Sequence, residues 1–181
     1  MSCLMAVVGL PGAGKSEVVA EFVAAGFTKV YFGGLTLEKI NEAGLEINEA
    51  NERLIREKLR ADHGMAAYAK LNLPKIESGL KLANVVIDGL YSWEEYLVLR
   101  EKFPSMTVVA VYGPPRLRYQ RLADRPVRPL TSKECQGRDY SQIENLHQAG
   151  PIAMAEQTVA NIGTLADLKK TVRELINAQE S

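Results

Sequence analysis

Residues 9–16 read Gly-Leu-Pro-Gly-Ala-Gly-Lys-Ser, which is the complete G-x-x-x-x-G-K-[ST] pattern. The apolar run Leu-Met-Ala-Val-Val at 4–8 precedes it, and a helical pattern that opens at Gly14 follows it. A strand, a glycine-rich turn and a helix in this order turn backbone N–H groups inward around a polyphosphate. We therefore expect a nucleoside triphosphate site. A dinucleotide site is disfavoured, because Glu17 stands where the third glycine of G-x-G-x-x-G would be.

The residue types of this loop have distinct chemical roles. Lys15 supplies a point charge for the β and γ phosphate oxygens, and the Ser16 hydroxyl can ligate Mg²⁺. The residues that we expect to contact the nucleotide are Gly9, Pro11, Gly12, Ala13, Gly14, Lys15, Ser16 and Glu17. The alternative interpretation is a glycine-rich turn between a strand and a helix, with a lysine that happens to lie on the helix.

Length and composition predict one α/β domain over residues 1–181, since 46% of the chain is hydrophobic and 24% is charged. The 22 basic residues balance the 22 acidic ones, so no global field favours nucleic acid or an anionic membrane as a partner. The start of the chain lacks the features of a signal peptide, and no segment is long enough to span a bilayer, so we expect a cytoplasmic protein. Cys3 and Cys135 lack the C-x-x-C spacing of a zinc site.

Apolar runs alternate with helical patterns along the chain, which predicts a parallel sheet with helices on both faces. The expected strands are 4–8, 29–32, 84–88, 107–112 and 158–161. The expected helices are 15–24, 49–62, 65–78, 92–102, 115–123, 132–147 and 165–178. Capping boxes at Ser92 and Thr164 mark two helix starts. The arginine- and proline-rich segment 124–137 interrupts the pattern and is a candidate mobile lid.

A second element of the nucleotide site follows the third strand. Residues 84–89 read Asn-Val-Val-Ile-Asp-Gly, a buried type of strand that ends in the carboxylate of Asp88. Such a carboxylate can hold Mg²⁺ opposite the Ser16 hydroxyl, directly or through water. A strand that ends in Asp-Gly is also a common turn, so the argument for a nucleotide depends mainly on the loop at 9–16.

Arginines cluster between the fourth strand and the candidate lid. Arg118, Arg121 and Arg125 have helical spacing that places them on one side of a helix. Fixed positive charge on a closing lid is what phosphoryl transfer needs, so we expect Arg121 and Arg125 to be catalytic together with Lys15. The alternative is a solvated basic face. We disfavour it because Asp124 is the single acidic residue between 116 and 125.

These motifs resemble those of small P-loop kinases of the adenylate kinase and dephospho-CoA kinase group, and more closely those of archaeal dephospho-CoA-kinase-like P-loop proteins. The segments that carry the resemblance are 7–16, 59–64, 86–89, Arg121-Leu122 with Arg125, Arg138-Asp139 and 161–165. It implies a P-loop NTPase three-layer sandwich with a five-stranded core and an arginine-rich lid, ATP or GTP with Mg²⁺ as cofactors, and Asn161, Gly163 and Thr164 beside the purine base. For this last loop, a plain helix cap is the alternative.

The chain departs from these kinases on the acceptor side. They usually carry an acidic residue after the second strand, where this chain has Gly33-Gly34, and often an arginine after the Asp-Gly of the third strand. Arg60 and Asp88 remain as candidates for acceptor binding. His63 before Gly64 fits the end of a helix better than a site. The aromatic residues at 91, 93 and 96 either line the acceptor side or belong to the core.

Two functions therefore stay open. The first is a kinase that moves the γ-phosphoryl group of ATP to a small acceptor of the nucleoside monophosphate or dephospho-CoA type. The second is a nucleotide-binding regulatory or interaction protein on a kinase scaffold, which the loss of acidic and basic residues on the acceptor side favours.

Overall fold

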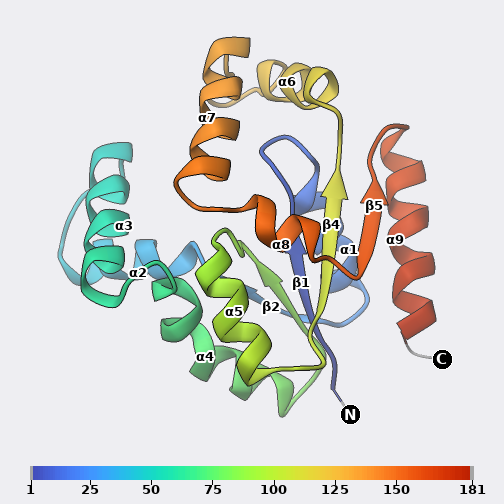
Figure 1. Cartoon of the computed structure of the whole chain (residues 1–181), viewed down its shortest axis with the longest axis horizontal. Coiled ribbons are helices and arrows are strands. Elements are labelled where there is room, and N and C mark those ends of the chain that lie inside the picture. The colour runs from blue at the N-terminus through green and yellow to red at the C-terminus, as the bar shows by residue number, and fades with distance from the viewer. Residues whose placement is uncertain (1, 180–181) are drawn as a thin grey trace.

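The computed structural model describes residues 2–179 and contains a parallel sheet flanked by helices (Figure 1). The five strands have the order β2-β3-β1-β4-β5, and all four pairings are parallel. The strands are β1 (Leu4–Val8), β2 (Thr28–Tyr31), β3 (Val85–Asp88), β4 (Thr107–Tyr112) and β5 (Gln157–Ala160). Each lies within one residue of its predicted range. The central strand β1 is buried at every position, because helices cover both faces of the sheet.

The helices connect these strands and cover them. Their bounds are α1 (Lys15–Ala24), α2 (Gly34–Glu42), α3 (Glu49–His63), α4 (Ala67–Leu80), α5 (Trp93–Lys102), α6 (Pro115–Ala123), α7 (Ser132–Glu144), α8 (Ala149–Ala153) and α9 (Leu165–Gln179). Among the described residues, no helix has both the length and the apolar character that crossing a membrane requires.

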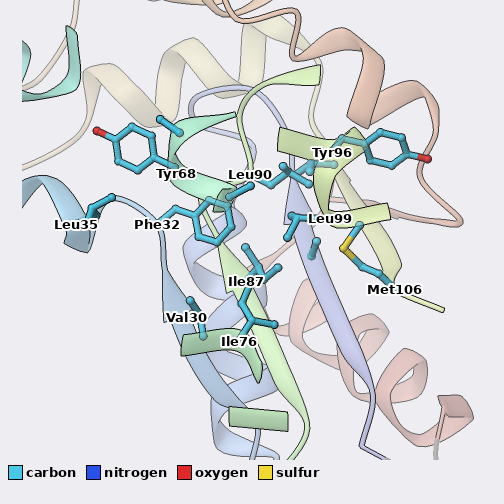
Figure 2. Packing of buried hydrophobic residues seen from close by; sticks show 14 of the residues in the cluster. Val30, Phe32, Leu35, Tyr68, Ile76, Ile87, Leu90, Tyr96, Leu99 and Met106 are labelled. Carbon is cyan, nitrogen blue, oxygen red and sulfur yellow. The ribbon is translucent and has the colours of Figure 1, made fainter. Parts of the chain in front are cut away.

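Two apolar clusters hold the layers together, one on each face of the sheet. The first packs the sheet against α4, α5 and α8, with Ile76, Ile87 and Leu99 fully buried in it (Figure 2). The second packs the opposite face against α1 and α9, with Phe22 and Val172 fully buried. The three-layer α/β architecture predicted from the sequence is therefore confirmed.

The register of the sheet brings three loops together at one edge. Val7 of β1 is aligned with Asp88 of β3 on one side and with Val109 of β4 on the other. The loops that follow β1, β3 and β4 therefore leave the sheet at similar heights, at the edge over which α6 and α7 lie (Figure 1). In parallel α/β sheets this carboxyl edge is where ligands bind.

Two helices differ from the sequence prediction. Helix α2 was not expected, because Gly33-Gly34 lies at its start and glycines favour a turn. The expected helix 132–147 begins at the right residue but runs three residues too far: α7 ends at Glu144, and α8 is a separate helix. His147 between them has a φ of +54°, which a right-handed helix does not allow. In the candidate lid 124–137, residues 124–131 are irregular and residues 132–137 begin α7.

Candidate functional site

The loop between β1 and α1 requires glycine at several positions. Gly9, Gly12 and Gly14 have φ values of +147°, +77° and +104°, which side chains rarely allow. A Cβ at Gly12 would lie 2.6 Å from the carbonyl oxygen of Arg118, and one at Gly14 would collide with the amide of Asn161. No side chain caps the first turn of α1 at Gly14. The N–H groups of this turn can therefore serve an anion.

The Lys15 side chain folds back over this loop. Its Nζ donates hydrogen bonds to the carbonyl oxygens of Gly9 and Leu10 at 2.6 and 3.3 Å, and it lies 6.0 Å from the centre of the Tyr91 ring. The pKa of Lys15 is lowered to about 8, mainly by burial, with Asp88 opposing this shift and nearby arginines adding to it. An anion bound in the loop would favour the charged form of this lysine.

Asp88 is the last residue of β3, and its carboxylate forms an ion pair with a second lysine. The Nζ of Lys29, on the edge strand β2, lies 2.9 Å from the Asp88 Oδ2. Lys29 was not among the residues predicted from the sequence. It could have been found as a charged residue two positions before the end of β2, the strand that pairs with β3.

Mg²⁺ prefers a carboxylate and a hydroxyl together with phosphate oxygens and water. Ser16 is exposed at the start of α1, and the Asp88 carboxylate already attracts a positive group, so these two residues fit the ion. Among residues 2–179, no three His, Cys, Asp or Glu side chains form a cluster that could hold a metal by themselves.

Arg118 is the best-fixed side chain of the site, and it is not on a solvated face. Its guanidinium forms two hydrogen bonds with the Asp139 carboxylate, at 2.8 and 2.6 Å, and donates to the carbonyl oxygens of Pro11 and Gly113. It therefore joins the phosphate-binding loop to α6 and α7. The prediction that the arginines lack acidic partners is wrong for Arg118, because its partner lies 21 residues further along the chain.

Arg121 and Asn161 form a second connection to the loop. Asn161 donates from Nδ2 to the carbonyl oxygen of Ala13 at 2.8 Å, and Arg121 Nη2 donates to Asn161 Oδ1 at 3.1 Å. The Nη1 of Arg121 is buried and has no hydrogen-bond partner among the described residues. Arg125 lies beyond the end of α6 and is exposed, although its charge reaches Lys15. The prediction that Arg118, Arg121 and Arg125 share one side of a helix is therefore wrong for Arg125, because α6 ends at Ala123.

The loop after β5 contains the helix cap that the sequence predicted. Thr164 and Asp167 exchange hydrogen bonds, with the Asp167 N–H donating to Thr164 Oγ1 at 3.2 Å and the Thr164 N–H donating to Asp167 Oδ2 at 2.9 Å. The Thr164 side chain therefore serves α9, and Gly163 lies exposed beside it. A contact of this loop with a purine stays a prediction.

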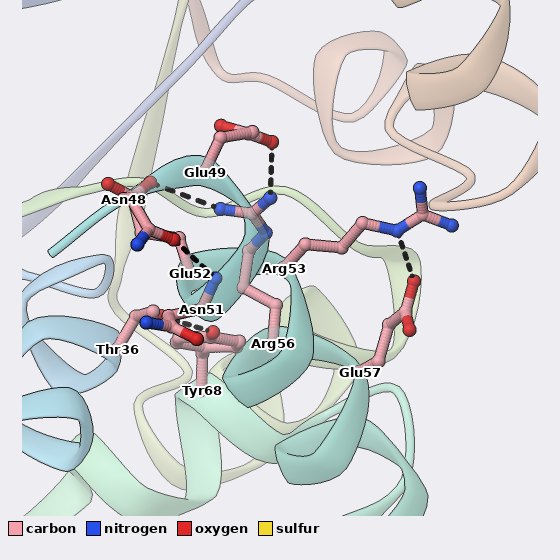
Figure 3. Close-up of polar contacts among 9 residues, drawn as sticks. All are labelled: Thr36, Asn48, Glu49, Asn51, Glu52, Arg53, Arg56, Glu57 and Tyr68. Carbon is pink, nitrogen blue, oxygen red and sulfur yellow. Dashed lines mark hydrogen bonds and ion pairs between the residues drawn. The ribbon is translucent and has the colours of Figure 1, made fainter. Parts of the chain in front are cut away.

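On the acceptor side, Arg60 lies near the end of α3. Its guanidinium carbon is 5.6 Å from the centre of the Tyr68 ring, and its buried Nε has no hydrogen-bond partner within residues 2–179. Arg56, one turn earlier, pairs with Glu49 and Glu52 at 3.1 and 3.4 Å (Figure 3). His63 is the last residue of α3 and is exposed, as expected for a helix end.

Three aromatic residues near the Asp-Gly turn have different surroundings. Tyr96 is buried and stacks on Trp93, with ring centroids 4.9 Å apart, so both belong to the core. Tyr91 instead lies near the Lys15 ammonium, and its pKa is raised to about 12, mainly by burial and also by the charge of Asp88. Of the aromatic residues that the sequence left open, Tyr91 therefore faces the site.

Comparisons with known proteins agree with this geometry. A family described as an AAA domain (AAA_18) matches residues 5–144. The UPF0200 protein TK1334 of Thermococcus kodakarensis is 36% identical over 183 residues, covering 96% of this chain and 98% of the relative. The UPF0200 protein of Aeropyrum pernix is also 36% identical, covering 94% of this chain and 90% of the relative.

Solved structures share the fold at low sequence identity. TT1252 from Thermus thermophilus superimposes with a TM-score of 0.68 at 18% identity, covering 98% of this chain and 97% of that one. Shikimate kinase from Bacteroides thetaiotaomicron superimposes with a TM-score of 0.61 at 15% identity, covering 99% of both chains. The glycine-rich loop, the parallel sheet and these matches together show that the chain belongs to the UPF0200 family of proteins with a P-loop kinase-like domain.

Proposed function

We propose that the protein is an ATP-binding phosphotransferase that moves the γ-phosphoryl group to a small acceptor of the nucleoside monophosphate or dephospho-CoA type. The observation that carries the proposal is the position of Lys15. Its ammonium donates hydrogen bonds to two carbonyl oxygens of the glycine-rich loop and is close enough to Asp88 for that charge to raise its pKa, at the carboxyl edge of the parallel sheet. A phosphate group bound there would meet a lysine, the backbone amides and the N-terminus of α1.

Each side chain has a role in this proposal. Lys15 and the loop amides bind the β and γ phosphates, while Asn161, Gly163 and Thr164 lie beside the purine base. Arg121, with its unpaired Nη1, and Arg125 place positive charge near the migrating phosphoryl group. Ser16 and Asp88 would hold Mg²⁺, which when bound neutralises charge on the phosphates. Positioning and electrostatics provide the catalysis, so the chain needs no covalent intermediate.

A second candidate function is nucleotide binding without turnover, as a regulatory or interaction protein. The observation that favours it is the loop after β2, where Gly33-Gly34 stands in place of an acidic residue. The same observation fits a kinase whose acceptor needs no side-chain base, so the two functions must be separated by assay.

The test is acceptor-dependent release of ADP from MgATP. The native protein, Lys15→Ala and the matched control Lys170→Ala, an exposed lysine of α9, are incubated with nucleoside monophosphates or with dephospho-CoA. We expect acceptor-dependent ADP from the native protein and the control, and a loss of at least about a hundredfold in Lys15→Ala. Equal turnover by Lys15→Ala would refute the assignment. ATP binding without any turnover would favour the regulatory function.

A further inference from the structure

Two tyrosines lie where charged residues were expected, Tyr31 at the end of β2 and Tyr91 after β3. A Cβ built at Gly33 would overlap the phenol ring of Tyr31, so this ring lies directly over the backbone that follows β2. A Cβ built at Gly89 would lie 3.3 Å from the Tyr91 ring and 3.8 Å from the Gly33 nitrogen. The loops after β2 and β3 are therefore adjacent, and each carries a tyrosine next to Asp88.

These phenols act as hydrogen-bond donors and not as bases. Burial raises the pKa of Tyr91 to about 12, and burial together with Asp88 also raises the pKa of Tyr31. Both hydroxyl groups therefore keep their protons at neutral pH. Tyr31 is 46% exposed, so its hydroxyl is within reach of a ligand that enters from solvent.

The carboxylates of Asp88, Glu52 and Glu95 near these tyrosines are either paired with a cation or buried, and the buried Oε1 of Glu95 has no hydrogen-bond partner among the described residues. Asp88 pairs with Lys29 at 2.9 Å, and Glu52 pairs with Arg56 at 3.4 Å. Glu95 is 1% exposed, and its Oε2 accepts hydrogen bonds from the N–H groups of Tyr91 and Ser92. Cations hold Asp88 and Glu52, and Glu95 is closed off from solvent, so none of these three presents a free and exposed carboxylate.

Positive charge surrounds the same place. Lys15 lies 6.0 Å from the centre of the Tyr91 ring and Lys29 lies 5.1 Å from that of Tyr31. The charge of Arg56 also lowers the pKa of Tyr31, and Arg60 lies over the ring of Tyr68. Arg60 also influences Glu95, whose carboxylate holds the loop of Tyr91. Its unpartnered Nε needs an acceptor atom such as an anionic oxygen.

We infer that the acceptor is a phosphate monoester, that Tyr31 and Tyr91 determine its specificity by donating hydrogen bonds, and that the product is a diphosphate. This inference rests on the proposed phosphotransferase function. An oxygen of the acceptor phosphate forms a bond to the γ-phosphorus. The bond between the γ-phosphorus and the bridging oxygen breaks, and that oxygen leaves with the electron pair on ADP.

The chemistry of the nucleophile separates this acceptor from an alcohol. A phosphate monoester has a second pKa of about 6, so it is already ionised at neutral pH and loses no proton in the reaction. An alcohol must lose a proton, which kinases that act on hydroxyl groups transfer to a carboxylate base. The acceptor side of this chain provides hydrogen-bond donors and cations where such a base would lie, and it therefore fits the phosphate.

The test uses acceptors that differ by one phosphate. MgATP is combined with AMP, GMP, CMP, UMP or dTMP, with the five matched nucleosides, or with dephospho-CoA, and the product is identified by ³¹P NMR. We expect a new diphosphate from a monophosphate and no product from its nucleoside. A new phosphate ester from a nucleoside or from dephospho-CoA would overturn the inference and leave the phosphotransferase proposal intact. Bound ATP with no turnover in any reaction would overturn both.

Two variants test the role of the tyrosines. Tyr31→Phe and Tyr91→Phe keep the rings and remove the hydroxyl groups, and Tyr140→Phe on the exposed face of α7 is the matched control. We expect the KM for the acceptor to rise about tenfold in each test variant while the KM for ATP stays unchanged. The rate should also fall below pH 6 in all of these proteins, as the acceptor becomes protonated. An unchanged acceptor KM in both variants would overturn the specificity role.

Discussion

Arg118 of α6 and Asp139 of α7 form a bidentate ion pair with almost no solvent exposure, and the same guanidinium donates to the carbonyl oxygen of Pro11 at 3.0 Å. One side chain thus connects the candidate lid region to the phosphate-binding loop. A movement of α7 that carried Asp139 away would leave a buried charge beside the nucleotide site, so the position of α7 and the shape of the loop are coupled.

Replacing Asp139 should therefore be costly. In Asp139→Ala, Arg118 keeps its charge in a buried place without a partner, and we expect a loss of about 3–5 kcal/mol in the free energy of unfolding, measured with urea. The control is Glu57→Ala, which removes an exposed pair with Arg53 on α3 and should cost less than about 1 kcal/mol. Similar losses in the two variants would contradict the structural role of the buried pair.

The buried carboxyl of Glu95 should make stability depend on pH. Burial raises its pKa to about 7 from an ordinary value of 4.5, against the effect of the Tyr91 and Ser92 N–H groups. The folded protein therefore holds this proton more tightly than the unfolded chain. The resulting stabilisation is complete below pH 4.5 and is lost as the pH rises through 7.

The measurement compares the native protein with Glu95→Gln, whose side chain stays neutral. The free energy of unfolding of the native protein minus that of the variant should fall by up to about 3 kcal/mol between pH 4.5 and pH 8. Glu101→Gln, an exposed position of the same helix, is the control and should give a constant difference. A difference for Glu95→Gln that rises with pH would contradict the assignment.

Asn161 should stabilise the phosphate-binding loop. In Asn161→Ala, the carbonyl of Ala13 loses its donor and Arg121 loses an acceptor, so we expect a loss of about 1–3 kcal/mol in stability together with weaker ATP binding. The neighbouring Ile162 is exposed, and Ile162→Ala should change stability by less than about 0.5 kcal/mol. Native ATP affinity in Asn161→Ala would argue against a role of this residue in shaping the loop.

Lys29 should compete with Mg²⁺ for Asp88. In Lys29→Met the carboxylate loses its cationic partner, and we expect the Mg²⁺ concentration for half-maximal ATP binding to fall by about two- to fivefold. Lys102→Met, which breaks a pair with Glu77 elsewhere on the surface, is the control. A higher Mg²⁺ requirement in Lys29→Met would mean that the lysine supports the metal site instead.

The strands were predicted well from the sequence because helices cover both faces of a buried parallel sheet. Its strands are therefore short, nearly continuous apolar runs, such as 107–112. The prediction failed at α2, where Gly33 caps the helix and Gly34 begins it, and where Tyr31 fills the space that a side chain at position 33 would need. It also failed at the end of α7, because the positive φ of His147 depends on the packing of the chain and not on its local pattern.

The parts of the candidate site that are encoded by a short stretch of sequence were predictable. The loop at 9–16 and the carboxylate of Asp88 are adjacent in space, as the strand order requires. The partners of Arg118 and Arg121 were not predictable, because Asp139 and Asn161 lie 21 and 40 residues away. Lys29 and Tyr31 were missed because their role follows from the pairing of β2 with β3. Spacing in the sequence does not specify such contacts.

The most direct test of the central claim is calorimetric titration with MgATP of the native protein, Lys15→Ala and Lys170→Ala between pH 7 and pH 9. Burial lowers the pKa of Lys15 to about 8, so the native protein and the control should bind ATP more weakly as the pH rises through that value. Lys15→Ala should bind at least about tenfold more weakly at pH 7 and lose this pH dependence. Equal affinity and an equal pH dependence in all three proteins would contradict the claim that Lys15 binds a nucleoside triphosphate.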